Sequence, residues 1–106
     1  IDYGTNSALG DFANHFINNF HADICFMSCR GLDRFGSYEA NYNQALLKQQ
    51  MIANSDLTVL LADSSKFHTS HYFKLANYNV IDYIITNEAP VESFQDTVNK
   101  QCEILW

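Results

Sequence analysis

The chain has 106 residues, which is enough for one domain and too few for two. Hydrophobic residues make up 47% of it and aromatic residues 14%, so it can form a core and is not a disordered segment. Twelve Asp and Glu outnumber six Lys and Arg, the net charge is −6, and residues 1–29 contain no basic residue. This balance disfavours non-specific binding to nucleic acid and attachment to anionic membranes.

The sequence has no segment that marks a membrane or secreted protein. No run approaches the roughly 18 consecutive apolar residues of a transmembrane helix, and no charged stretch followed by an apolar one opens the chain. Cys25, Cys29 and Cys102 are odd in number, and two of them lie in or beside an apolar run. This favours reduced thiols over a disulfide framework. We therefore expect a soluble, cytoplasmic protein.

The first half of the chain alternates helix and strand patterns. Apolar residues spaced by three and four positions predict an amphipathic helix over residues 9–20. A compact apolar run predicts a buried strand over residues 23–28, and a loop follows to about Tyr38. Residues 41–54 are rich in good helix formers and contain no Gly or Pro, which predicts a second helix.

The second half continues the alternation. Residues 57–62 predict another buried strand, and residues 72–78 predict a short helix. A run rich in β-branched residues predicts a strand over residues 80–86. Pro90 opens a predicted helix that extends to about Lys100, and residues 103–106 predict a last strand.

This order of elements predicts the fold class. Strands of six or seven residues that are apolar on both faces and alternate with helices are typical of an α/β layer structure with a largely parallel sheet. We find no internal repeat, low-complexity segment or linker. The sequence therefore predicts one Rossmann-like domain over residues 1–106, with a mostly parallel sheet flanked by helices.

Polar segments follow three of the predicted strands, at residues 28–33, 63–66 and 86–88. In open α/β sheets, ligands bind beyond the carboxyl ends of the strands. Three of the six basic residues of this acidic chain fall in these segments or directly after them. They are Arg30, Arg34 and Lys66. The local concentration of positive charge predicts an anionic ligand at this end of the sheet.

The most informative of these segments is Asp63-Ser64-Ser65-Lys66. Its two small hydroxyl residues leave backbone N–H groups accessible, and its lysine supplies a charge for a phosphate or carboxylate. Asp63 is placed to accept hydrogen bonds from sugar hydroxyls or to hold Lys66 in position. The alternative is an ordinary turn with an exposed lysine, because turns favour Asp and Ser without any ligand.

Other chemistries have weaker support in the sequence. His68 and His71 are three residues apart, but no third ligand follows at a spacing typical of zinc sites. Cys29 lies beside Arg30, which would lower the pKa of a reactive thiol, yet no nucleophile motif surrounds it. We therefore expect a structural thiol, no bound metal and no cofactor.

Several sequence blocks resemble the C-terminal sensor domain of DeoR-type transcriptional regulators, over about residues 9–87. The most distinctive is Leu-Leu-Ala-Asp-Ser-Ser-Lys-Phe at 60–67. Three further blocks, and a closing one in which Asn87 replaces the usual Asp, occur in the order of the family. They are Leu-Gly-x-x-Ala at 9–13, His-Ala-Asp-x-x-Phe-x-Ser-Cys-Arg-Gly-Leu-Asp at 21–33, Ala-Leu-Leu-Lys-Gln-x-Met-Ile at 45–52, and Ile-Asp-Tyr-Ile-Ile-Thr-Asn at 81–87.

The resemblance implies a sensor of phosphorylated sugars with the fold of ribose-5-phosphate isomerase, glucosamine-6-phosphate deaminase and CoA transferases. It also implies a homo-oligomer that binds DNA through an N-terminal winged helix-turn-helix. Neither that domain nor the family's first phosphate-binding strand and loop is found in this sequence. The chain begins with Ile1 rather than Met, so we expect it to be a partial sensor domain cut from a longer protein.

Departures from the family bear on mechanism. Where enzyme relatives carry Gly-Ala-Asp, this chain has Ser28-Cys29-Arg30, and Gln44 stands where sensors usually have Glu. Losing two acids indicates binding without turnover, because proton transfer needs a positioned acid or base. Asp33 and Asp63 remain, so an isomerase or deaminase is the alternative, and a pure interaction module is a third.

The predicted ligand site combines two cations, two acids and two small residues. Lys66 and Arg30 meet the phosphate, Asp33 and Asp63 accept hydrogen bonds from hydroxyls, and Gly31 permits close approach of the backbone. The expected ligand-binding residues are Arg30, Gly31, Asp33, Asp63, Ser65 and Lys66. No catalytic residue is expected.

Overall fold

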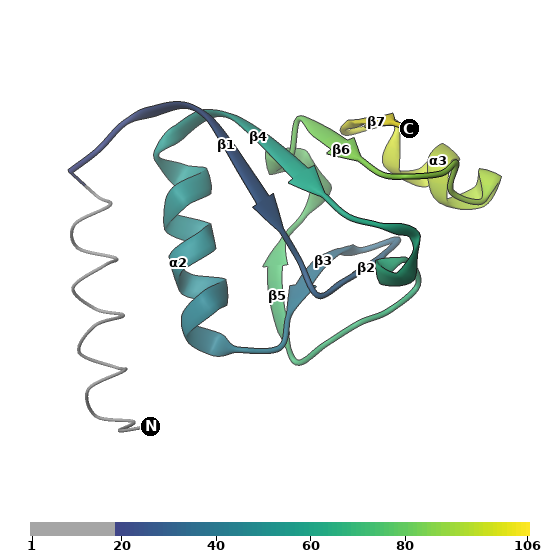
Figure 1. Cartoon of the computed structure of the whole chain (residues 1–106), viewed down its shortest axis with the longest axis horizontal. Helices are drawn as coiled ribbons and strands as arrows, with labels where there is room; N and C mark the ends of the chain where they lie inside the picture. The colour runs from purple at the N-terminus through teal and green to yellow at the C-terminus, as the bar shows by residue number, and fades with distance from the viewer. Residues whose placement is uncertain (1–18) are drawn as a thin grey trace.

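The structure is a computed structural model, and it describes residues 19–106. The helix expected over residues 9–20 lies outside this range except for its last two residues. The described elements run in chain order as drawn in Figure 1. They are β1 (Ala22–Ser28), β2 (Gly31–Asp33), β3 (Gly36–Glu39), α2 (Tyr42–Ala53), β4 (Ser55–Leu61), the 3₁₀ helix η1 (Ser64–Lys66), β5 (Phe73–Ala76), the 3₁₀ helix η2 (Tyr78–Val80), β6 (Tyr83–Ile85), α3 (Glu92–Val98) and β7 (Glu103–Leu105).

The larger sheet is wholly parallel. Its strand order is β1-β4-β6-β7, with Phe26 beside Val59 and Val59 beside Tyr83. Parallel neighbours need long crossover connections, and the segment with α2 supplies the one between β1 and β4. Leu32, Leu60, Ile81, Ile84 and Val98 are among the most deeply buried side chains. The predicted α/β class with a mostly parallel sheet is confirmed.

The helix predicted over residues 41–54 is confirmed as α2. Asn41 caps its first turn, because the Asn41 side chain accepts a hydrogen bond from the backbone N–H of Gln44. Asn54 ends it, with its backbone N–H directed at the carbonyl groups of the last turn. The helix contacts β1, β3, β4 and β5. Figure 1 shows it beside the parallel sheet and reaching the smaller one.

A second sheet was not predicted. It is antiparallel, in the order β2-β3-β5, and its first hairpin occupies what the sequence indicated as a loop up to Tyr38. The helix predicted over residues 72–78 is wrong, because Phe73–Ala76 forms β5. β5 pairs with β3, and the Gln49 side chain of α2 donates hydrogen bonds to the carbonyl groups of Lys74 and Leu75. These distant partners satisfy the backbone groups that a helix would have paired locally.

The remaining elements are found but are shorter than predicted. The strand expected over residues 80–86 is Tyr83–Ile85, and the helix expected over residues 90–100 is Glu92–Val98. The last strand, Glu103–Leu105, pairs in parallel with β6. The ends of helices and strands are the least certain part of a prediction from sequence.

Alternate side chains along β1 differ in burial. Cys25 and Met27 point into the core and are 6% and 5% exposed. Ile24 and Phe26, on the opposite face, are 46% and 58% exposed, and Ile24 lies beside the exposed Leu57 of β4. The strands are apolar on both faces as predicted, but within residues 19–106 one face of this sheet is open.

Two further findings concern membrane-spanning helices and the cysteines. No helix in residues 19–106 has both the length and the apolar character needed to cross a membrane. Cys25, Cys29 and Cys102 are all buried and none forms a disulfide, so the predicted free thiols are confirmed.

Candidate functional site

The polar loops that follow β1, β4 and β6 meet at one end of the parallel sheet, as predicted. The backbone N–H of Ser64 donates a hydrogen bond of 2.9 Å to Asn87 Oδ1, which joins the loop after β4 to the loop after β6. Arg30 follows β1, and Lys66 ends η1 directly after β4. Since β1 and β4 are parallel neighbours, their carboxyl ends bring these two residues to the same edge.

A cavity of about 520 Å³ opens at this edge, and we call it the rim cavity. It is lined by Ser28, Cys29, Arg30, Glu39, Ala40, Asn41, Gln44, Lys48 and Lys66. Three cations and one carboxylate give its side chains a net charge of +2, although the whole chain carries −6. The positive charge of the chain is therefore concentrated where a ligand is expected.

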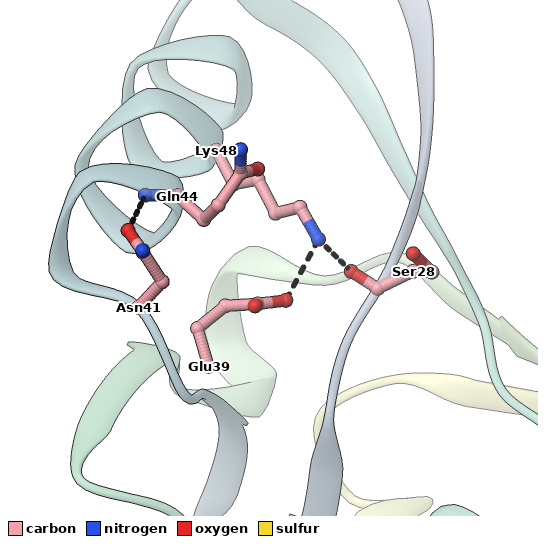
Figure 2. A network of polar contacts seen from close by, with 5 residues as sticks. All are labelled: Ser28, Glu39, Asn41, Gln44 and Lys48. Atoms are coloured by element: carbon pink, nitrogen blue, oxygen red, sulfur yellow. Dashed lines mark hydrogen bonds and ion pairs between the residues drawn. The ribbon is translucent and has the colours of Figure 1, made fainter. Parts of the chain in front are cut away.

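The floor of the rim cavity is a network that joins α2 to both sheets (Figure 2). Lys48 Nζ lies 2.7 Å from Glu39 Oε2 and donates a second hydrogen bond of 2.7 Å to the carbonyl group of Ser28. The side chain of Glu39 is 5% exposed and that of Lys48 16% exposed. This cation is thus neutralised within the protein and held in place.

Arg30 and Lys66 are the other cations of the cavity, and their surroundings differ from those of Lys48. Neither side chain has a hydrogen-bond or ion-pair partner among residues 19–106, Arg30 is exposed and Lys66 is half-buried. Unpaired basic side chains on one concave surface are suited to an anion, because a phosphate or carboxylate would gain charge-assisted hydrogen bonds from both.

Asp63 and Ser65 have local partners. Asp63 Oδ1 accepts a hydrogen bond from the backbone N–H of Ser65, at 2.9 Å, and another from the Ser65 hydroxyl group. These two hydrogen bonds, with the charge of Lys66 as a smaller cause, lower the pKa of Asp63 below its ordinary value. These contacts between Asp63 and Ser65 form the start of η1, the helix that ends with Lys66. They fit the second role considered for Asp63, which was to hold Lys66 in position.

Gly31 and Asp33 also make contacts within the protein itself. A Cβ atom at Gly31 would lie 2.2 Å from the carbonyl oxygen of Thr69, so the close approach seen here is to Thr69. Asp33 Oδ1 accepts hydrogen bonds from the backbone N–H groups of Phe35 and Gly36 and closes the turn between β2 and β3. Of the six predicted ligand residues, only Arg30 and Lys66 line the rim cavity.

Two other cavities lack this arrangement. One of about 340 Å³ includes Asp33 and Arg34, but the Arg34 guanidinium lies over the Phe35 ring, 4.8 Å from its centre. A larger one, of about 630 Å³, lies at the amino ends of β6 and β7, with Asp82 and Glu103 beside Lys100. Ligands of open α/β sheets bind at the opposite, carboxyl ends.

Thiol and metal chemistry gain no support at the rim. Burial raises the pKa of the Cys29 thiol to about 11, so it is protonated at neutral pH and is a poor nucleophile. Away from the rim, His21, Asp23 and Asp56 form an exposed cluster with ligand atoms within 4.8 Å of one another. Exposed acidic groups are often found without a metal.

Sequence reasoning missed Glu39 and Lys48. Lys48 lies within the family-like block over residues 45–52 and one helical turn after Gln44, and that spacing was the available signal. Glu39 gave no signal, because it ends β3 and the hairpin that carries it was not predicted. Its burial beside Lys48 depends on pairing with β5 and on the position of α2.

Comparison with known proteins identifies the family of the chain. Residues 1–88 match the model of the family described as DeoR C terminal sensor domain. The chain therefore belongs to the DeoR C-terminal sensor domain family, as its sequence blocks suggested.

Curated relatives carry names of regulators. The chain is 35% identical over 95 residues to the uncharacterized HTH-type transcriptional regulator YulB of Bacillus subtilis, covering 85% of this chain and 37% of that protein. It is 32% identical over 95 residues to the L-fucose operon activator of Haemophilus influenzae, covering 89% and 36%. It is 28% identical over 83 residues to the glycerol-3-phosphate regulon repressor of Haemophilus influenzae, covering 77% and 32%. The matched region spans about a third of each relative.

Proposed function

We propose that this chain is the effector-binding part of a transcriptional regulator and that its effector is a phosphorylated sugar or a related metabolite. The observation that carries the proposal is the convergence of Arg30 and Lys66, both unpaired within the described residues, on one cavity at the carboxyl ends of β1 and β4. Their charges suit a phosphate. Asn41 and Gln44, on the same cavity, offer polar atoms for hydroxyl groups.

The names of the relatives support this class of ligand. One relative is named for an L-fucose operon and another for a glycerol-3-phosphate regulon. The first name contains a sugar and the second a phosphorylated polyol. The rim cavity is lined by basic and amide side chains. Such a lining fits a ligand that has both a phosphate and hydroxyl groups.

Control of DNA binding belongs to another part of the parent protein in this proposal. A winged helix-turn-helix at the N-terminal side binds the operator, and the effector changes its affinity for DNA. The present chain carries −6, so on its own it should not retard duplex DNA in a salt-sensitive manner. The regulator works in the cytoplasm, where its operator DNA is.

We further propose that the domain binds its ligand without turnover. Asp33 and Asp63, the acids that kept an isomerase or deaminase in view, accept hydrogen bonds from nearby backbone groups. Glu39, the acid of the rim cavity, is held by Lys48. A coupled assay with aldose and ketose phosphates tests this, and turnover above the rate without protein would contradict it.

A homo-oligomer is part of the same proposal. Among residues 19–106, β1 is an edge strand of the parallel sheet, and unpaired edges favour pairing with a further chain. The exposed Ile24 and Phe26 add apolar area beside that edge. Sedimentation at several concentrations tests this, and a monomer throughout the range would contradict it.

The decisive experiment measures binding by the chain together with its DNA-binding region. Calorimetry and thermal unfolding would compare sugar monophosphates, the same sugars without phosphate, and inorganic phosphate. A ligand at 100 times its Kd should stabilise the folded state by about 2.7 kcal/mol. We expect stabilisation by at least one sugar monophosphate and none by its parent sugar. Absence of binding across all phosphorylated compounds would contradict the proposal.

A further inference from the structure

Within the described part of the chain, only one oxygen of the buried Glu39 carboxylate has a hydrogen-bond partner. The residue is 4% exposed, and its Oε2 accepts the 2.7 Å hydrogen bond from Lys48 Nζ that Figure 2 shows. Within residues 19–106, Oε1 accepts no hydrogen bond. A buried charged oxygen without a donor is costly, so such a group calls for an explanation.

The position of Glu39 indicates the kind of donor that is required. Glu39 lines the rim cavity together with Arg30 and Lys66, so a donor supplied by a ligand in this cavity would be close to its carboxylate. A carboxylate accepts hydrogen bonds only, and it repels a second anion. A hydroxyl group of the ligand fits Oε1, and a phosphate or carboxylate group does not.

The Lys48 network holds this acceptor in place. Lys48 Nζ bridges Glu39 and the carbonyl group of Ser28, which joins the end of β3 to the end of β1 through α2. The carboxylate therefore has a defined position before a ligand arrives, which is what selection by hydrogen bonding requires. The rim cavity thus contains two cations without partners in the described residues and one carboxylate that Lys48 already holds in place.

We propose that Glu39 is a specificity-determining residue of the rim cavity. It accepts a hydrogen bond at Oε1 from a hydroxyl group of an effector whose phosphate is bound by Arg30 and Lys66. The cavity then selects hydroxylated monophosphates and rejects bisphosphates and phosphorylated sugar acids, whose second anion would meet the carboxylate. This inference rests on the proposed function, and it adds a residue that the sequence blocks did not indicate.

The test uses the chain together with its DNA-binding region and needs two variants. Glu39→Gln keeps the size of the side chain and removes its charge, while Glu92→Gln makes the same change at an exposed position in the first turn of α3. Calorimetry gives Kd for a sugar monophosphate, its deoxy analogues, the corresponding bisphosphate and inorganic phosphate. In the wild type, we expect one deoxy analogue and the bisphosphate to bind at least tenfold more weakly than the monophosphate.

In Glu39→Gln, we expect the monophosphate to lose about tenfold in affinity and the preference over the bisphosphate to fall by at least tenfold. Inorganic phosphate should bind no more weakly than before, and Glu92→Gln should change none of these ratios. An unchanged preference in a folded Glu39→Gln would overturn the inference and leave the proposed function standing. If that variant does not fold, equal wild-type affinity for the monophosphate and bisphosphate would overturn it. Failure of the wild type to bind any phosphorylated compound would overturn both proposals.

Discussion

The acidic and basic side chains beyond the carboxyl ends of β1 and β4 are used in different ways. Asp33 and Asp63 accept hydrogen bonds from backbone N–H groups two or three residues further along the chain. Arg30 and Lys66, which follow the same two parallel strands, have no such partner within the described residues and line the rim cavity. Acids and bases that look equally suited to a ligand in sequence therefore have different structural environments.

The physical reason is the chemistry of tight turns. A turn leaves N–H groups without partners in the chain, and short carboxylate side chains satisfy them locally. Lys and Arg have no acceptor atoms, so they cannot satisfy these N–H groups, and their long side chains carry the charge away from the backbone. In this domain Asp33 and Asp63 therefore satisfy nearby backbone groups, whereas Arg30 and Lys66 have no side-chain partner within the described residues. Glu39 is the exception, because it ends a strand and meets Lys48.

The largest expected effect on stability concerns the ion pair between Glu39 and Lys48. Lys48→Met leaves the Glu39 carboxylate buried without its cation, and breaking a buried ion pair in this way costs about 3 kcal/mol of unfolding free energy, since Lys48 is slightly exposed. Urea denaturation measures the loss, with Lys100→Met as an exposed control. Equal stability of the two variants would show that the pair contributes little to the fold.

Lys66→Ala tests the other side of the comparison. A charge-assisted hydrogen bond contributes about 1.5 to 3 kcal/mol, so affinity for a sugar monophosphate should fall roughly 10-fold to 150-fold. Stability should change by less than about 0.5 kcal/mol, because the side chain has no hydrogen-bond or ion-pair partner to lose within residues 19–106. Calorimetry and urea denaturation measure both quantities, and Lys100→Ala is the matched control. Unchanged affinity would remove Lys66 from the site.

Asp33→Ala should show the reverse pattern. Removal of the carboxylate frees the N–H groups of Phe35 and Gly36 in the turn, which should lower the unfolding free energy by about 1 kcal/mol. Affinity for a sugar monophosphate should stay within about twofold, because Asp33 lines a different cavity. A loss of affinity as large as that of Lys66→Ala would place Asp33 at the ligand, as its sequence position first suggested.

Substitution of Asp63 should have the smallest effect on stability. The direction of its pH dependence follows from the hydrogen bonds that Asp63 accepts. Its pKa in the folded state is below the ordinary value of 3.8, so the ionised form stabilises the fold above that pH. The contribution disappears as the pH falls through the lowered pKa. Asp63→Asn keeps an acceptor but cannot ionise, so its stability relative to the wild type should improve between pH 4 and pH 2, as urea midpoints would show. A constant difference across this range would contradict the assignment.

The rim itself was predictable from local chemistry. Buried strands over residues 23–28 and 57–62 have continuous apolar runs, and each is followed by a polar segment with a basic residue. Parallel pairing then requires Arg30 and Lys66 to meet at one edge. The partner of each acid was not predictable with the same ease, because ligand and backbone both offer donors to a carboxylate.

The sequence by itself determined the α/β class, the boundaries of α2 and the end of the sheet at which a ligand is expected, because periodicity, caps and apolar runs are local properties. Tertiary structure alone decided the antiparallel sheet. β5 pairs with β3 across more than thirty residues of sequence, and that pairing overrides the helical preference expected over residues 72–78. The same pairing places Phe73 beside Glu39, and Lys48 reaches Glu39 from α2. The burial of a side chain and the partners of its polar atoms depend on how distant segments pack together. Local sequence patterns do not contain that information.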